Sequence, residues 1–154
     1  MNKDTVINGN RLTDMKGMKE KTVQGMFAFH DLLVEKKIIE KNDKLRFSGG
    51  AEKGGGHKND KALKDKNNKS HDPLSHSDGD KFDISYRDFP DRIFKGIESR
   101  GKKEAQKIMK KIGGTLKSRV LTSGDTFKYY EITHNGITME IHIESNHFDI
   151  GVRQ

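Results

Sequence analysis

The chain contains no cysteine and no tryptophan, only two prolines, and no long run of apolar residues. Without cysteine there is neither a disulfide framework nor a thiolate zinc site, so any transition metal must be held by His, Asp or Glu. No segment approaches the roughly 20 apolar residues of a membrane-spanning helix, and the polar N-terminus lacks the apolar core of a signal peptide. These absences predict a chain that is made as a soluble cytoplasmic protein.

Charged residues make up 34% of the sequence and hydrophobic residues only 31%, which predicts a small core and several long loops. The length of 154 residues is usual for one domain, so we expect residues 1–154 to form a single domain. The net charge of +7 indicates an anionic partner, which is nucleic acid, a cell wall that carries anionic polymers, or a membrane surface.

Hydrophobic periodicity predicts an α+β fold, in which a small, mostly antiparallel sheet is flanked by helices. The expected elements are a helix over 21–37, a strand over 44–49, a strand over 81–86, a helix over 88–114 with Gly101 as a candidate break, and antiparallel strands within 118–154. Residues 48–80 have almost no apolar side chains and are expected to be a long polar loop that lines the site. Residues 1–20 are expected to be a flexible N-terminal segment.

Two short glycine signals fix the expected ends of elements. Gly113 and Gly114 follow the last apolar residue of the second helix and predict where that helix ends. Asn135 and Gly136 lie between two alternating apolar runs, which is a strong signal for a tight β-hairpin turn.

His76 and Asp83 form the first half of a candidate metal site, in the stretch LSHSDGDKFDIS at residues 74–85. Asp83 lies in the predicted strand, on the face opposite the apolar side chains, because alternate residues of a strand point to opposite faces. His76 lies in the preceding loop, and Gly79 allows the chain to fold back between them. Imidazole and carboxylate are both good zinc ligands, but a catalytic zinc needs a third protein ligand and a general base.

The stretch MEIHIESNHF at residues 139–148 offers both missing groups. His147 follows Glu144 by three positions, and a kink between them can put both on the same side of a metal. His142 shares a strand face with Glu144 and is the alternative third ligand. A carboxylate beside the metal can take a proton from water and later give it to a leaving amine, which is the role expected of Glu144.

Together the two stretches resemble the zinc motifs of the D-Ala-D-Ala carboxypeptidase and phage-endolysin metallopeptidases, a family of the hedgehog-type superfamily. The first motif, His-x-x-Gly-x-x-x-Asp-Ile, is similar to HSDGDKFDI, and the second, Glu-x-x-His-Phe/Tyr, is similar to ESNHF. The resemblance covers most of residues 22–153. It implies zinc on His76, Asp83 and His147, Glu144 as general base, and a peptidoglycan peptide as substrate. Such an endolysin-like hydrolase or toxin would reach the cell wall after release or export by a partner.

The sequence differs from the family pattern at two places. Lys81 stands where the family usually has a small residue. After the Ser-Gly of residues 48–49 the family usually has an arginine that holds a substrate oxygen or carboxylate. The candidates for that substrate-binding role in this chain are Lys53, His57 and Lys58.

Four further polar residues have simpler expected roles. His30 lies at the apolar edge of the first helix and is expected to be structural, and His134 precedes the Asn-Gly turn and is expected to be exposed. Asp80 and Asp149 are candidate acceptors that would orient the ligand histidines.

Two other functions stay open on the sequence. A metal-independent, toxin-like ribonuclease pairs two histidines, or a histidine with a carboxylate, as general acid and base, and the basic loop with His57 and His71 suits RNA. A basic, non-catalytic protein that binds and regulates an acidic partner would give the histidines no chemical role.

Overall fold

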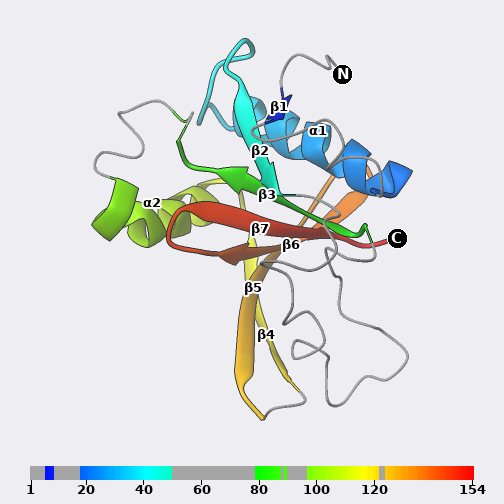
Figure 1. Ribbon diagram of the computed structural model, residues 1–154, viewed down its shortest axis with the longest axis vertical. Coiled ribbons are helices and arrows are strands. Elements are labelled where there is room, and N and C mark those ends of the chain that lie inside the picture. The colour runs from blue at the N-terminus through cyan, green and yellow to red at the C-terminus, as the bar shows by residue number, and fades with distance from the viewer. Residues whose placement is uncertain (1–5, 9–17, 50–78, 88, 90–96, 122–123) are drawn as a thin grey trace.

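The computed structural model describes residues 6–8, 18–49, 79–87, 89, 97–121 and 124–154, which form an α+β fold (Figure 1). The helices are α1 (Glu20–Glu35) and α2 (Ile97–Lys111). The strands are β1 (Val6–Asn8), β2 (Leu45–Gly49), β3 (Lys81–Ser85), β4 (Thr115–Val120), β5 (Thr126–His134), β6 (Ile137–Ile143) and β7 (His147–Val152).

One sheet contains all of these strands, in the order β1-β2-β3-β7-β6-β5-β4. β1 pairs with β2 in parallel, and every other neighbouring pair in that order is antiparallel. The predicted mostly antiparallel sheet is therefore confirmed. Because β7 lies between β3 and β6, the C-terminal motif is brought directly beside the strand that carries Asp83.

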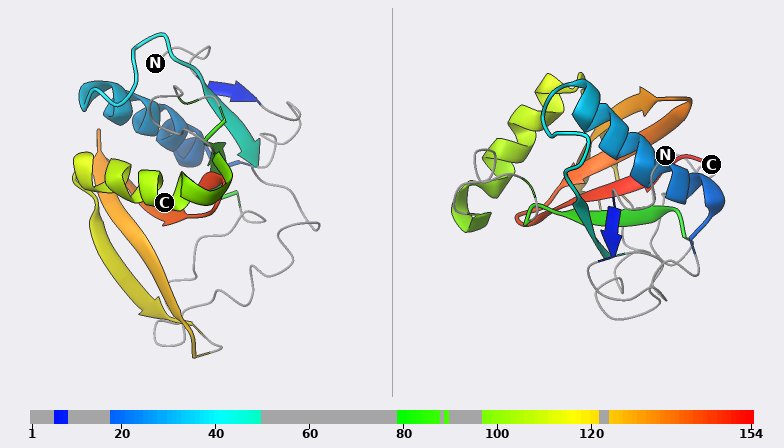
Figure 2. Two further views of the ribbon diagram at one scale, coloured as in Figure 1. Left: turned by 90° about the vertical axis from the view of Figure 1, so that its left-hand side faces the viewer. Right: turned by 90° about the horizontal axis from the view of Figure 1, so that it is seen from above.

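The hydrophobic core lies between the two helices and one face of the sheet (Figure 2). Phe148 of β7 is fully buried, and its ring contacts those of Phe29, Tyr86 and Phe89 in edge-on or tilted arrangements. Such pairs add to the burial of apolar surface. The helices cover the same face, so the opposite face of the sheet is left to polar side chains.

The glycine signals in the sequence act as expected. Gly113 has a φ of +84°, and the N–H groups of Gly113 and Gly114 donate to the carbonyls of Lys110 and Met109, which ends α2 in a Schellman motif. Asn135 and Gly136 have φ of +52° and +76°, as a hairpin turn of type I′ requires.

Gly101, His30 and two polar segments of the chain carry the remaining predictions about the fold. α2 runs without a break through Gly101, so the candidate break there is wrong. His30 is buried, and its Nε2 lies 2.6 Å from the Asp43 carbonyl oxygen, which fits the expected structural role. Part of the N-terminal segment expected to be flexible, residues 6–8, forms β1. Most of the predicted loop over 48–80 lies outside the described residues.

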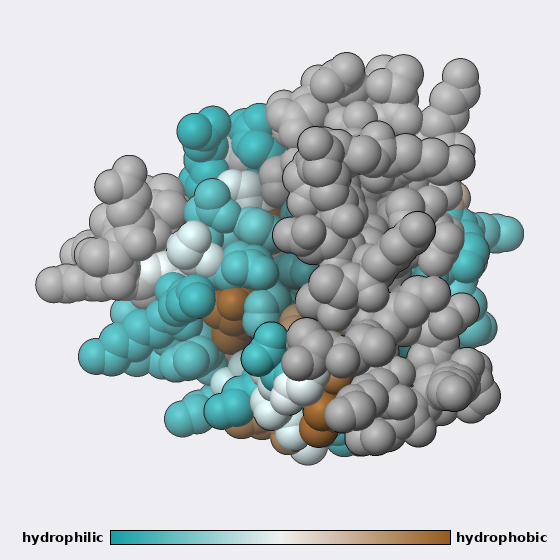
Figure 3. Space-filling view, turned by 60° about the horizontal axis from the view of Figure 1, so that its bottom comes forward, coloured by the Kyte–Doolittle hydropathy of each residue, from teal (hydrophilic) through white to brown (hydrophobic). Residues whose placement is uncertain are grey.

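The described surface is largely hydrophilic, as the teal side chains of Figure 3 show on one side of the molecule. Among the described residues, the large hydrophobic side chains that are exposed are Leu116 and Val120, both on the edge strand β4. No helix in the described ranges is long and apolar enough to span a membrane.

Candidate active site

The face of the sheet opposite the helices carries a row of ionisable side chains across three neighbouring strands. Asp83 of β3 pairs in register with Asp149 of β7, and Asp149 pairs with His142 of β6. Residues directly opposite one another in adjacent strands have side chains on the same face. The row therefore brings Asp83, from the first half of the predicted site, close to the second half.

His147 and Asp83 form the first pair of the site. Nε2 of His147 lies 3.6 Å from Oδ1 of Asp83, and the Asp83 side chain is only 12% exposed. Nδ1 of His147 lies 2.6 Å from the side-chain oxygen of Asn146, so this nitrogen carries the proton and donates it. The other nitrogen, Nε2, is thereby directed to the carboxylate.

Glu144 and His142 form the second pair, with Nε2 of His142 at 3.2 Å from Oε1 of Glu144. The hydrogen bond from His142 lowers the pKa of Glu144, aided by the charges of His142 and His147, although burial acts against the shift. Burial would lower the pKa of His142, but Glu144, the Lys128 carbonyl and the charge of Asp149 outweigh it and raise that pKa. The two shifts have opposite directions, and both favour the charged forms of the pair.

The turn between Glu144 and His147 is anchored to the core by Tyr86. The Tyr86 hydroxyl donates to the Glu144 carbonyl oxygen at 2.6 Å, and the Tyr86 N–H donates to the carbonyl of Asn146 at 3.1 Å. Within the turn, the Glu144 N–H donates to the His147 carbonyl. Because the Tyr86 ring packs on buried Phe148, these hydrogen bonds hold the turn at a defined position relative to the core.

Lys81 forms an ion pair within the sheet. Its side chain is only 7% exposed, and Nζ lies 2.8 Å from Oδ2 of Asp149. Asp80 in turn holds Nζ of Lys19 at 2.7 Å. That these two aspartates orient ligand histidines stays a prediction.

The structure brings together four of the predicted site residues: Asp83, Glu144, His147 and the alternative ligand His142. The remaining ones lie outside the described residues, namely His76, Lys53, His57 and Lys58. Within the ranges that the structure describes, no group of three or more His, Asp or Glu side chains forms a metal-binding cluster. Of the three predicted metal ligands, the structure therefore describes two, Asp83 and His147, and these two lie side by side.

Sequence reasoning missed Tyr86, Asn146 and the Lys128 carbonyl as parts of the site. Tyr86 is predicted only as an apolar residue of its strand, and its hydroxyl reaches Glu144 because β3 and β7 are neighbours. Asn146 had one available signal, since an amide beside a histidine can fix its tautomer. A main-chain carbonyl such as that of Lys128 leaves no signal in a sequence.

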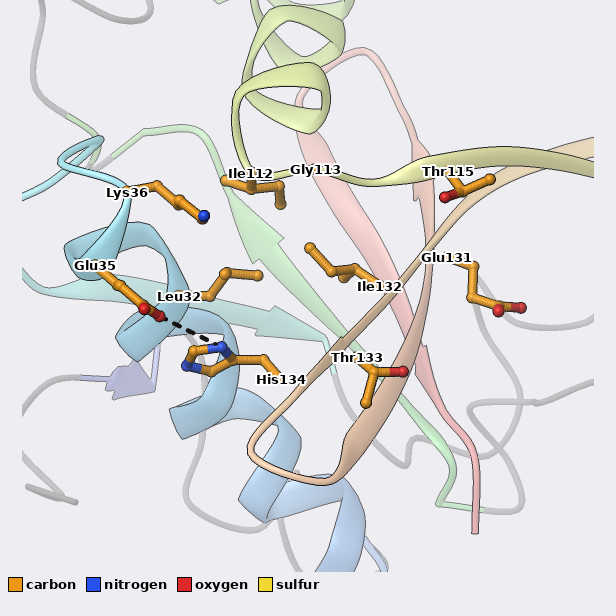
Figure 4. A pocket seen from close by; sticks show the side chains of 10 residues that line it. All are labelled: Leu32, Glu35, Lys36, Ile112, Gly113, Thr115, Glu131, Ile132, Thr133 and His134. Atoms are coloured by element: carbon orange, nitrogen blue, oxygen red, sulfur yellow. Dashed lines mark ion pairs between the residues drawn. The ribbon is translucent and has the colours of Figure 1, made fainter.

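A cavity of about 470 Å³ lies on the helix side of the sheet, away from these pairs (Figure 4). Leu32, Ile112 and Ile132 point toward its centre. His134 stands at its edge with Nδ1 at 3.6 Å from Oε2 of Glu35, and it is 15% exposed rather than fully exposed as expected. Since none of the described site residues lines this cavity, it is separate from the two pairs of the candidate active site.

Comparisons of the chain with models of protein families, with curated proteins and with solved structures find no match. What the site can do must therefore follow from its own groups. Those groups are two adjacent histidine–carboxylate pairs on an otherwise ionic sheet face, one of them partly open to solvent at Glu144.

Proposed function

We propose that the protein is a zinc-dependent hydrolase that cleaves amide bonds of peptidoglycan peptides, as a relative of the D-Ala-D-Ala carboxypeptidase and phage-endolysin metallopeptidases. The observation that carries the proposal is the 3.6 Å approach of His147 Nε2 to Asp83 Oδ1 from strands that are far apart in the chain. These are two of the three ligands that the resemblance implies. Glu144, the implied general base, belongs to the same face of the sheet.

The Asp83–His147 pair fits zinc. Two ligand atoms at about 2.1 Å from a tetrahedral zinc are about 3.4 Å from each other, close to the 3.6 Å between these atoms. Because Nδ1 of His147 donates to Asn146, Nε2 is the nitrogen that faces a carboxylate oxygen of Asp83. Such an arrangement favours a cation or a proton between them. Asp83, His147 and His76 would hold the ion.

Glu144 supplies the proton chemistry in this proposal. Zinc, when bound, would polarise the scissile carbonyl and lower the pKa of a water molecule. Glu144 would take a proton from that water and return it to the leaving amine. Its lowered pKa keeps the carboxylate ionised at neutral pH, and its side chain is 40% exposed, so solvent and substrate can reach it.

Metal analysis combined with a turnover assay on peptidoglycan peptides tests the proposal. The wild type, purified without added zinc, is expected to carry about one zinc per chain and to lose turnover in EDTA. His76→Ala, Asp83→Ala and His147→Ala should lose both metal and turnover. His134→Ala removes a histidine that is paired with Glu35 on the other side of the sheet, so it is the matched control and should keep both.

The general base is tested separately by Glu144→Gln. This change should leave the zinc content unchanged and lower turnover by about 100-fold or more, because an amide cannot accept the proton. Full activity of Glu144→Gln would show that another group is the base. Metal that survives His147→Ala but is lost in His142→Ala would identify His142 as the third ligand.

The same geometry favours one second function. Two histidines on neighbouring strands, each beside a carboxylate, can act as general acid and general base without a metal, as in a ribonuclease. A proton would then occupy the place between His147 and Asp83. RNA cleavage that persists in EDTA, in a protein that carries no zinc, would establish the ribonuclease and reject the peptidase. Binding of an acidic partner without any turnover would support the third function, a basic, non-catalytic protein that binds and regulates that partner.

A further inference from the structure

His142 is held on three sides. Nδ1 lies 2.8 Å from the main-chain oxygen of Lys128, Nε2 lies 3.2 Å from Oε1 of Glu144, and the ring lies 4.6 Å from that of Phe127, centroid to centroid. These contacts to a neighbouring strand, to a carboxylate and to an aromatic ring restrain the orientation of the imidazole on β6.

Both ring nitrogens of His142 are already engaged. A carbonyl oxygen only accepts hydrogen bonds, so Nδ1 carries a proton that is donated to Lys128. Nε2 is then the nitrogen that faces Glu144. A metal ligand needs one nitrogen free of other partners, and in the described part of the chain His142 offers none. Its geometry differs from that of His147, whose Nε2 faces the predicted ligand Asp83.

We propose that His142 is a positioning residue, which holds the Glu144 carboxylate in the orientation that the proposed base needs and does not ligate the metal. This inference rests on the proposed function. Glu144 has a long side chain that is 40% exposed. Among the described residues, its other hydrogen bonds are made by its main chain to Tyr86 and His147. His142 is therefore the group that restrains its carboxylate.

Three variants test this role in the zinc-loaded protein. His142→Leu removes the donor, and kcat should fall by about 10- to 100-fold because a misplaced catalytic group loses its alignment. KM should change less than about threefold and the zinc content should not change, since substrate contacts and ligands remain. His142→Gln keeps a side-chain N–H that can reach Glu144 and should restore most of kcat. His134→Leu removes a histidine–glutamate pair elsewhere and should behave as wild type.

A measurement without turnover shows whether the pair exists. In imidazole nitrogen–proton NMR spectra, Glu144→Gln should shift the His142 signals and leave those of His134 unchanged. Unchanged His142 signals would overturn the inference while leaving a zinc peptidase intact. Zinc loss in His142→Leu, full kcat in His142→Leu, or equal loss in His142→Gln would also overturn it. A wild type that lacks both zinc and turnover would instead overturn the proposed function, and with it this role.

Discussion

Tyr86 links the hydrophobic core to the candidate site through a single hydroxyl group. Its ring is fully buried against Phe148, while its hydroxyl donates to the carbonyl oxygen of Glu144 at 2.6 Å. Burial, and to a smaller extent the charge of Glu144, raises the pKa of Tyr86, so the hydroxyl stays protonated and remains a donor. One residue thus sets both the packing of β7 and the position of the proposed base.

Tyr86→Phe is expected to lower the free energy of unfolding by about 1–2 kcal/mol, because the Glu144 carbonyl loses its donor while the ring remains. Turnover should fall as well, since the 144–147 turn is less restrained. Urea denaturation and the peptide assay measure the two effects. Tyr130→Phe is the control: Tyr130 is half-buried beside the core, and removing its hydroxyl should change neither quantity. Equal effects of the two changes would contradict the role of Tyr86.

Between elements, α2 contacts the 144–147 turn at Gly101. A Cβ added at Gly101 would lie 2.5 Å from the carbonyl oxygen of Ser145 and 3.2 Å from two ring carbons of Tyr86. The first contact is with backbone, which cannot move aside as a flexible side chain would. The glycine that sequence analysis treats as a candidate break is therefore a close-packing position within a continuous helix.

Gly101→Ala should destabilise the protein by about 1–3 kcal/mol through overpacking, although alanine is intrinsically better than glycine in a helix by about 1 kcal/mol. Turnover should fall in parallel, because the clash displaces the turn that carries Glu144. Thermal or urea unfolding and the peptide assay measure both. The control Lys103→Ala changes an exposed position of the same helix and should stay within about 0.5 kcal/mol of wild type. A stabilised Gly101→Ala variant would show that the helix and turn do not pack this closely.

Strands β4 and β5 form a hairpin that extends away from the helices (Figure 1) and is tied to the sheet by an ionic network. Arg119 and Arg153 both contact Glu140, at 2.9 Å and 2.8 Å, and Glu131 contacts Lys117 and Arg153. Burial acts to raise the pKa of Glu131, but the two cations outweigh it and lower that pKa.

The lowered pKa of Glu131 determines how its contribution to stability depends on pH. A carboxyl group whose pKa is lowered on folding stabilises the native state above its unfolded pKa, and that contribution is lost as the pH falls through the folded pKa. Glu131→Gln should therefore cost roughly 0.5 kcal/mol at pH 7, a small value because the pairs are partly screened, and the cost should vanish as the pH falls well below 4.5. Urea denaturation across pH 3–7 measures it. Glu104→Gln, at an exposed pair in α2, is the control and should show little change at any pH.

On the scale of the whole molecule, positive charge exceeds negative charge. The chain carries a net charge of +7. Exposed lysines follow α2 at positions Lys102, Lys103, Lys107, Lys110 and Lys111. They lie on the helix side of the sheet, whereas the candidate site lies on the opposite face. Under the proposed function, attachment to an anionic wall polymer and cleavage of its peptide would therefore use different surfaces.

Raising the salt concentration should separate the two proposed activities, since the Debye length shrinks from about 10 Å at 0.1 M to about 3 Å at 1 M. Binding of the Glu144→Gln protein to purified cell walls should weaken several-fold, as measured by co-sedimentation. Hydrolysis of a short uncharged peptide by the wild type should change less than about twofold. Wall binding that does not respond to salt would show that the charge of +7 has no part in it.

The sequence alone determined which side chains share a face and where several elements end. Strict alternation places Glu140 and His142 opposite Met139 and Ile141, and the burial of the two apolar residues agrees with it. The end of the second helix at Gly113-Gly114 and the turn at Asn135-Gly136 could also be predicted from the sequence. Each depends on a local backbone conformation that glycine adopts easily. These are short-range properties, fixed within a few residues.

Only the tertiary structure decided which strands are neighbours. The insertion of β7 between β3 and β6 puts His147 beside Asp83, gives Glu144 the hydroxyl of Tyr86, and brings Gly101 against the turn. Local periodicity cannot specify such contacts, because any apolar strand face can pack on any other. The order of strands depends on contacts between distant segments, which bury apolar surface under the two helices and pair ionic side chains on the other face.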